Sequence, residues 1–463
     1  MTTADGATVG ERERPMGIGG SMHPCTDGAP TAAQPRIPRR SVASWVLYDL
    51  ANTIFSMGVV SLYFPLWVRK EVGDTRADSV YGVIAAISMG IIFIASPLLG
   101  AMTDRARRRM PFLITSTLIC VVLTALLARG GFYITAVLFI LANVAYQAGL
   151  QFYDAMLPEV STEENRGKIS GIGVGVGYLG SYIAVGLGMD AVFGSEDSPF
   201  LFLMIACFFL LFALPAFLFV KERGNPNPRP VFSLAMARES TGETIRTLRS
   251  GSEYPGLVRF LIGRVFYTDS INTVISIMAL YTVNVAVSTG LSEKAGRDQA
   301  GFILMTAITF AVVGGFSWGW LVDRIGPKRT LNYVLSCWMG IFVLAAAVGI
   351  LGLPLAALYV VACAAGFALG GIWAADRPLM LRLTPPWRIG EFYGLYGMVG
   401  RFSAVTGPLI WAGVTAVTIR TLGLEPKVGQ GIAVLVLLSM IFVSYAILRP
   451  VTDTPRDWKA PPL

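Results

Sequence analysis

Long apolar runs constrain the fold of this chain more than any other feature. A transmembrane helix needs about 20 mainly apolar residues, and runs of that kind lie at roughly 42–68, 80–103, 111–128, 131–157, 167–190, 199–221, 257–287, 299–322, 330–350, 353–382, 388–419 and 430–449. Only 14% of the 463 residues are charged, whereas a soluble domain carries about 25%. The sequence therefore predicts an all-α polytopic membrane protein with twelve transmembrane helices.

The distribution of basic residues predicts the orientation of these helices. An even number of spans places both termini on one side, and most lysines and arginines near the spans fall in the loops of that side. The strongest example is DRARRR, residues 104–109, directly after the second span. Loops rich in lysine and arginine stay in the cytoplasm. We therefore expect both termini to be cytoplasmic in a bacterial-type plasma membrane, and the net charge of +8 to reflect topology rather than a nucleic-acid partner.

The apolar runs also divide the chain into five parts. Residues 1–41 have no apolar core and predict a disordered cytoplasmic tail. Residues 42–221 and 257–449 each hold six spans and predict two helical bundles in a protein expected to be monomeric. The polar segments 222–256 and 450–463 predict a cytoplasmic linker between the bundles and a second cytoplasmic tail.

Three sequence patterns recur in the same order in the two halves. DLANTIFS at 49–56 matches DSINTVIS at 269–276, and both fit D-x-x-N-T-x-x-S. GAMTDRARRR at 100–109 matches GWLVDRIGPKR at 319–329, and RGKISG at 166–171 faces RIGEFYG at 388–394. Three ordered matches at nearly one offset indicate a six-span unit duplicated in parallel. Such repeats are typical of transporters that handle a solute between the halves near the middle of the membrane.

The two G-x-x-x-D-R loops resemble the signature loop of the major facilitator superfamily. The resemblance covers Gly100, Asp104, Arg105, Gly319, Asp323, Arg324, Gly326, Lys328 and Arg329, and it departs from the pattern at Arg107, which stands where the second copy has Gly326. An acid is not needed to anchor a loop in the cytoplasm, because the positive-inside rule counts basic residues. We therefore expect Asp104 and Asp323 to act in gating.

Longer segments resemble one branch of that superfamily over roughly residues 42–449. They are WVLYDLANTIFS, FYDAMLPEVSTEENRGKISGIGVGVGYLGS and LTPPWRIGEFYGLYGMVGRFSAVTGP. The branch includes the fungal vacuolar amino-acid effluxers linked to autophagy and many bacterial members of unknown substrate. The resemblance implies the major facilitator fold, in which the first helix of each half lines a central cavity, and it makes amino-acid export the leading expectation.

Polar residues share one face on several predicted spans. At about 100° per residue, Asp49 and the three polar residues that follow it in its motif fall on one side of the first span. An acid at the centre of a membrane helix costs about 2.5–3.5 kcal/mol, so such a face should line the protein interior or a water-filled cavity. The predicted solute path comprises Asn52, Thr53, Ser56, Asn143, Tyr146, Gln147, Gln151, Asn272, Thr273 and Ser276.

Charged residues inside the spans are candidates for coupling or gating. They are Asp49, Asp154, Asp269, Arg264, Asp376, Arg377 and Arg401. Asp154 and Arg377 occupy matching positions of the two repeats, so we predict that they pair across the halves. For each charge the alternative is a structural ion pair that holds helices together. Asp49 lies about 10 Å into its span, at 1.5 Å per residue, and could bind solute or serve a cytoplasmic gate.

The sequence contains no P-loop, no metal-ligand spacing and no pair of catalytic residues, so no cofactor, no metal and no enzymatic activity are expected. GVGYLG at 175–180 lies within the fifth span and predicts helix packing instead of a dinucleotide site. We predict a secondary transporter of a small polar or amphipathic solute, with proton coupling and facilitated diffusion both open. The alternatives are an exporter of lipid-like or drug-like amphiphiles and a membrane receptor or scaffold that does not transport.

Overall fold

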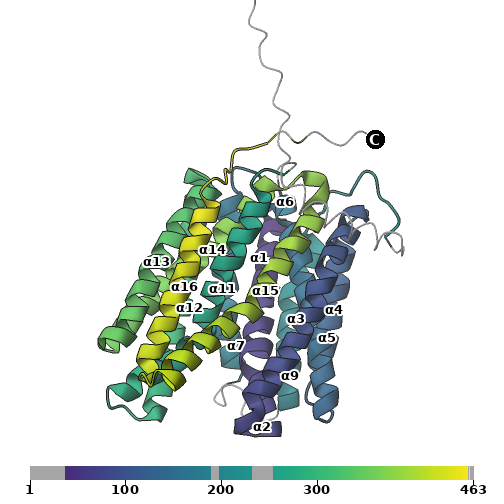
Figure 1. Cartoon of the computed structure of the whole chain (residues 1–463). Coiled ribbons are helices and arrows are strands. Elements are labelled where there is room, and N and C mark those ends of the chain that lie inside the picture. The colour runs from purple at the N-terminus through teal and green to yellow at the C-terminus, as the bar shows by residue number, and fades with distance from the viewer. Residues whose placement is uncertain (1–36, 189–197, 232–253, 457, 459–463) are drawn as a thin grey trace, which may run out of the picture. The chain divides into compact units, whose positions relative to one another are not determined.

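The computed structural model describes residues 37–188, 198–231, 254–456 and 458, so most of the predicted first tail and much of the predicted linker lie outside the described residues. Eleven described helices are long and apolar enough to cross a membrane. The helices, shown in Figure 1, are α1 Arg39–Phe55, η1 Ser56–Tyr63, α2 Phe64–Val72, α3 Asp74–Arg105, α4 Met110–Ala125, α5 Phe132–Ala155, α6 Leu157–Val160, α7 Arg166–Leu187, α9 Ser198–Phe219, α11 Leu257–Ser288, α12 Glu293–Ile325, α13 Pro327–Leu351, α14 Ala356–Leu383, η2 Pro386–Arg388, α15 Ile389–Thr415, η3 Ala416–Thr421 and α16 Pro426–Leu448.

Every predicted span corresponds to a helix, and three of them depart from the expected form. The eleventh ends in the π-helix η3. The first span is a continuous run from Arg39 to Val72 in which the π-helix η1 joins α1 to α2. The third is the apolar helix α4, which has 16 residues and is therefore about 24 Å long at 1.5 Å per residue. The fold is thus all-α, with the twelve predicted helical positions occupied.

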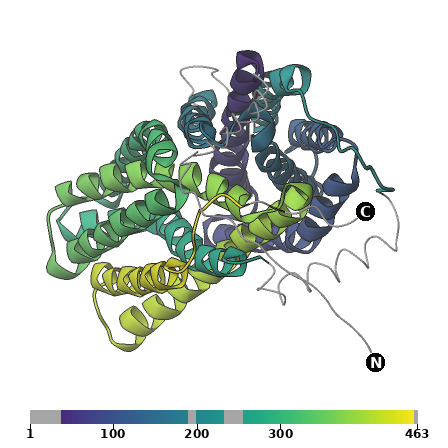
Figure 2. The ribbon, with the colours of Figure 1, turned by 90° about the horizontal axis from the view of Figure 1, so that it is seen from above.

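The helices form two groups that follow the duplicated sequence. In the first half α1 packs against α7 and α9, while α5 packs against α3 and α4. In the second half α12 packs against α14, while α16 packs against α11 and α13. Figure 2 shows the halves as a purple-to-blue group and a green-to-yellow group. They meet along two symmetric pairs, α3 with α15 and α7 with α12.

Glycines let the backbones of opposite halves touch along both pairs. A Cβ atom on Gly171 of α7 would lie 2.5 Å from the Cα atom of Gly319 in α12. A Cβ atom on Gly100 of α3 would lie 3.0 Å from the Cα atom of Glu391 in α15. Within the first half, a Cβ atom on Gly180 would lie 2.5 Å from the carbonyl oxygen of Leu50. The packing role predicted for the GVGYLG segment is therefore confirmed.

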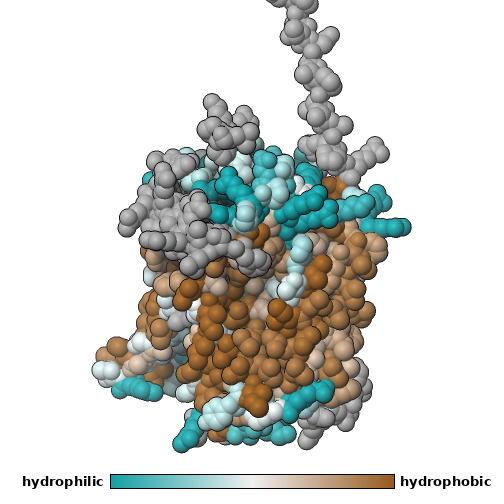
Figure 3. Space-filling model, turned by 90° about the vertical axis from the view of Figure 1, so that its right-hand side faces the viewer, coloured by the Kyte–Doolittle hydropathy of each residue, from teal (hydrophilic) through white to brown (hydrophobic). Residues whose placement is uncertain are grey.

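The outer surface is apolar over a broad band. Figure 3 shows this band between hydrophilic ends on one side of the molecule. Side chains such as Ile119 and Val122 on α4, and Val137 on α5, are about half exposed. Apolar exposure on this scale marks a surface that contacts lipid.

The two signature loops differ in form because only the second has a glycine at its turn. Gly326 adopts a φ of 89°, and this single residue connects α12 to α13. Arg107 occupies the matching place in the first loop, where residues 106–109 separate α3 from α4. A side chain disfavours positive φ, so the first loop makes its turn over more residues. Its backbone also pairs with the linker, since Asn225 donates to the Arg107 carbonyl at 2.8 Å.

Candidate functional site

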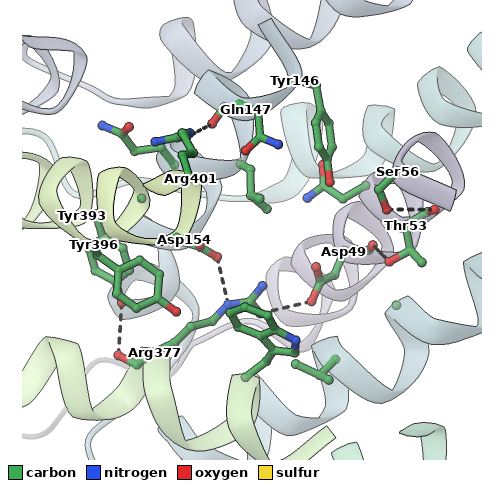
Figure 4. A pocket seen from close by; sticks show the side chains of 18 of the residues that line it. Asp49, Thr53, Ser56, Tyr146, Gln147, Asp154, Arg377, Tyr393, Tyr396 and Arg401 are labelled. Atoms are coloured by element: carbon green, nitrogen blue, oxygen red, sulfur yellow. Dashed lines mark hydrogen bonds and ion pairs between the residues drawn. The ribbon is translucent and has the colours of Figure 1, made fainter. Parts of the chain in front are cut away.

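A cavity of about 400 Å³ lies between the two halves. Its walls come from α1, α3, α5 and α7 of the first half and from α11, α14 and α15 of the second. The volume falls within the range of about 300–1,000 Å³ that is usual for small-molecule sites. Figure 4 shows its polar side chains converging from both halves.

Seven of the ten residues predicted to form the solute path line this cavity, and three do not. Those in the wall are Asn52, Thr53, Ser56, Tyr146, Gln147, Gln151 and Asn272. Asn143 is fully buried and donates to Ser88 Oγ at 2.8 Å inside the first half. Thr273 packs against α15 at Gly407, and Ser276 is exposed with its hydroxyl bonded to the Asn272 carbonyl at 2.8 Å.

Asp49, Asp154 and Arg377 form a charge cluster across the halves. Arg377 of α14 donates from Nη1 to Asp49 Oδ2 of α1 at 3.2 Å, and its Nε lies 2.9 Å from Asp154 Oδ1 of α5. The predicted pairing of Asp154 with Arg377 is therefore confirmed. The second contact lacks hydrogen-bond geometry, since neither of its two atoms has a hydrogen-bond partner. Two carboxylates share one guanidinium, so the ionised cluster carries a net charge of −1.

Arg264 and Asp376 form a second pair that stays inside the second half. Their side chains lie 3.0 Å apart, and the Asp376 carboxylate also accepts hydrogen bonds from Tyr267 at 2.6 Å and Tyr396 at 2.9 Å. Arg264 further donates to the Tyr396 carbonyl at 2.9 Å. Arg264 lines the cavity, whereas Asp376 is completely buried. This satisfied network fits the structural alternative stated above for intramembrane charges.

Arg401 lines the cavity without an acidic partner among the described residues. Its Nη1 donates to Ser96 Oγ on α3, and its Nη2 donates to the Gln147 carbonyl on α5 at 2.9 Å. Asp269, predicted from the repeated motif as a coupling residue, does not line the cavity. Its carboxylate is buried against α15, where it accepts a hydrogen bond from Thr406 at 3.0 Å.

The two signature-loop acids each cap a helix of the opposite half. Asp104 accepts hydrogen bonds from the backbone nitrogens of Gly390, at 2.7 Å, and Glu391, at 2.8 Å, in the first turn of α15. Asp323 accepts from the backbone nitrogens of Gly167, at 2.7 Å, and Lys168, at 2.9 Å, in the first turn of α7. The first turn of a helix has free N–H groups and a partial positive charge. Both acids therefore hold the halves together at this face of the molecule.

Four basic residues of the signature loops have contacts with the linker, with their own half or with solvent. Arg105 accepts a backbone hydrogen bond from Arg229 at 2.8 Å, and Arg324 lies over the Trp320 ring at 3.8 Å. The backbone nitrogen of Lys328 donates to Asp453 at 3.0 Å. Arg329 is exposed.

Aromatic and glycine residues complete the wall, and sequence reasoning did not assign them to it. The additional aromatic side chains are Tyr178, Trp373, Tyr393 and Tyr396. Gly397 and Gly400 leave room for two cavity arginines. A Cβ atom on Gly397 would lie 2.6 Å from Arg401 Nη1, and one on Gly400 would lie 3.2 Å from Arg264 Nη1. Gly397 precedes Arg401 by one helical turn, and this spacing could have placed both on the cavity face. No group of acidic, histidine or cysteine residues in the described ranges could hold a metal.

Comparison with protein families gives two matches. The model described as "Vacuole effluxer Atg22 like" matches residues 159–448, and the model described as "MFS_1 like family" matches residues 56–241. A Bacillus subtilis protein named "Uncharacterized MFS-type transporter YxiO" is 24% identical over 91% of this chain and 98% of its own length. Autophagy-related protein 22 of Eremothecium gossypii is 20% identical over 80% of this chain and 84% of its own length.

Solved structures show the same fold at low sequence identity. The human organic anion transporter MFSD10 superposes with a TM-score of 0.68 at 16% identity, covering 89% of this chain and 99% of its own. The proton:xylose symporter XylE gives a TM-score of 0.61 at 14% identity, covering 88% and 93%.

Proposed function

The chain belongs to the Atg22-like vacuole effluxer family of major facilitator transporters, and we propose that it exports amino acids across the membrane by alternating access. The observation that carries this proposal is the cavity between the halves, which presents acidic and basic side chains to the same small volume. An amino acid carries both charges at neutral pH, so such a wall can hold its two ends at once.

Alternating access is supported by the contacts that close one face. Asp104, Asp323 and Arg377 all bridge the halves. Moving the halves apart at this face has to break both helix caps and separate Arg377 from its carboxylates. These bonds define one of two packings, and the second packing would open the cavity toward this face. We propose that this face is cytoplasmic, because it carries the basic DRARRR loop and the described ends of the chain.

Proton coupling is part of the proposal. The cluster of Asp49, Asp154 and Arg377 carries one negative charge in excess when ionised. A proton on one carboxylate neutralises it and lowers the cost of withdrawing Arg377 when the halves separate. Asp49 and Asp154 are thus the proposed carriers, while Asp269, which lies outside the cavity, is no longer proposed as one.

A second candidate function is supported by the aromatic wall. Trp373, Tyr178 and Tyr393 line the cavity beside the charged groups, and flat aromatic surfaces bind apolar and cationic amphiphiles. In the export of a drug-like or lipid-like amphiphile, these aromatic side chains would bind the solute, and the charged side chains would not be needed for its recognition.

Reconstitution separates the two candidates. Purified protein in liposomes is loaded with a mixture of labelled amino acids in one set and with a fluorescent cationic dye in another. We expect amino-acid efflux well above that of protein-free vesicles and of vesicles with Arg377→Gln protein. Dye efflux without amino-acid efflux would replace the first candidate by the second. Vesicles that release neither solute faster than the controls would contradict transport of both classes.

A further inference from the structure

Arg401 differs from the other two cavity arginines in the partners that it contacts. Arg264 and Arg377 both pair with carboxylates. Arg401 contacts only neutral oxygens among the described residues, the Ser96 hydroxyl and the Gln147 carbonyl. Its residue is 5% exposed, and its Nε is buried without a hydrogen-bond partner. A guanidinium has five N–H donors, so donors remain for a ligand.

An arginine in this position needs an anion. Arginine does not lose its proton in proteins, and a buried charge without a counter-charge is costly. Gly397 increases the space around this guanidinium, since a Cβ atom there would lie 2.6 Å from Nη1. The planar guanidinium matches a carboxylate in geometry and can bind it through two parallel hydrogen bonds.

The acidic cluster offers the opposite charge to the same cavity. Asp49 and Asp154 share the single guanidinium of Arg377, and the Asp154 contact lacks hydrogen-bond geometry. Asp154 Oδ1 can therefore still accept a hydrogen bond. Figure 4 shows Asp154 between Arg401 and Arg377 in this view. An ammonium group at Asp154 would complete a cluster of two anions and two cations.

We propose that the transported solute is bound as a zwitterion, with its carboxylate on Arg401 and its ammonium group on Asp154 and Asp49. This inference rests on the proposed transport function and adds which residue recognises which end of the solute. Arg401 also contacts both α3 and α5 from its place on α15. The solute carboxylate would therefore bind where the two halves are in contact. Separation of the halves would change the surroundings of this binding site.

Binding measurements on the purified full-length protein test this assignment. The probes are L-leucine and L-phenylalanine, chosen because Met89, Leu150 and Trp373 make part of the wall apolar. Each is compared with its carboxamide, which lacks the carboxylate, and with its N-acetyl derivative, which lacks the ammonium group. Affinity is read from the shift of the thermal unfolding midpoint with ligand concentration. The variants are Arg401→Gln, Asp154→Asn and Arg420→Gln, an exposed arginine outside the cavity.

The unmodified protein should bind each amino acid about 10- to 100-fold more tightly than its carboxamide, the usual contribution of hydrogen bonds to a charged group. Arg401→Gln should remove that preference by weakening amino-acid binding alone, and unchanged carboxamide binding then shows that the variant is folded. Asp154→Asn should remove the preference over the N-acetyl derivative, and Arg420→Gln should change neither.

Three results would overturn the assignment, and the first two concern the carboxylate. One is equal affinity of the unmodified protein for the amino acid and its carboxamide. The other is a preference for the carboxylate that survives in Arg401→Gln. If no zwitterion binds, the assignment is also wrong, and the liposome assay then decides separately whether the protein transports another solute.

Discussion

Asp104 Oδ1 lies 2.7 Å from the backbone nitrogen of Gly390, so a carboxylate at the end of α3 caps the first turn of α15 in the opposite half. The pair of Asp323 with Gly167, also at 2.7 Å, repeats this relationship with the halves exchanged. The duplicated signature loop thus produces two equivalent bonds between halves. In the proposed alternating-access cycle, opening this face breaks both bonds.

Removing the charge of either cap should shift the protein toward the state open at this face. Asp104→Asn and Asp323→Asn should each weaken the closed state by about 0.3–1 kcal/mol, the usual contribution of a negative charge at a helix N-terminus, or about 2- to 5-fold in the equilibrium. Distances between spin labels on the two halves measure the shift. Asp298→Asn, an exposed position on α12, is the matched control. Unchanged distances in both cap variants would show that the caps do not hold the face closed.

Arg377 should be less replaceable than either of its carboxylates. Asp154→Asn leaves the Arg377–Asp49 bond in place, whereas Arg377→Gln leaves two buried carboxylates without a cation. Loss of one partner of a buried pair costs about 3–5 kcal/mol. We therefore expect a large drop of the unfolding midpoint for Arg377→Gln, partly restored in the double variant Asp154→Asn/Arg377→Gln. Arg329→Gln, at an exposed position in the first turn of α13, is the control. Strictly additive losses would show that the two residues do not interact.

Cysteine labelling should follow the cavity wall and not the sequence motif. On a background without native cysteines, Cys at Asn52, Ser56 and Asn272 should react with a water-soluble thiol reagent, because these residues line the cavity. Cys at Ile54, which is completely buried, should react far more slowly. Bound substrate should slow the three cavity positions. Equal rates at all four positions would contradict the assignment of this wall as the solute path.

An imposed pH gradient should drive solute movement if the acidic cluster carries a proton. Liposomes with and without the gradient are compared for the unmodified protein and for the double variant Asp49→Asn/Asp154→Asn, which cannot bind a proton at either carboxylate. We expect the gradient to raise accumulation only in the unmodified protein. Exchange of solute against solute should also weaken in this variant, because the same two carboxylates form the proposed ammonium site. If accumulation is the same with and without the pH gradient in both proteins, transport is facilitated diffusion.

The sequence predicted the architecture well because its strongest features are repeated and long. Apolar runs located the helices, and the repeat predicted the pair of Asp154 and Arg377 that the structure contains. Helical periodicity was less informative about the site. It shows which residues share one face of a helix, but it does not show whether that face meets the cavity or another helix. Asn143 shares a face with Gln147 and Gln151, yet it contacts Ser88 inside the first half.

The aromatic wall was harder to predict for a related reason. Trp373 and Tyr178 lie in apolar runs where an aromatic side chain is equally expected to contact lipid or another helix. The packing of α14 and α7 around the cavity places both side chains in its wall. Asp269 is the opposite case. The repeated motif predicted it for the solute path or its coupling, but α15 covers its carboxylate.

The glycine contacts between the halves bear on how fast the closed face can open. Gly171 and Gly319 meet through backbone atoms, and glycine has no side-chain rotamers that become ordered on contact. Closing this part of the interface therefore costs no side-chain entropy, and opening it releases none. In the proposed cycle, the transition then depends on directional bonds between the halves, among them the two caps and the contacts of Arg377 and Arg401. A protein built in this way can alter its exchange rate through single polar substitutions while the helix–helix contact surface stays the same.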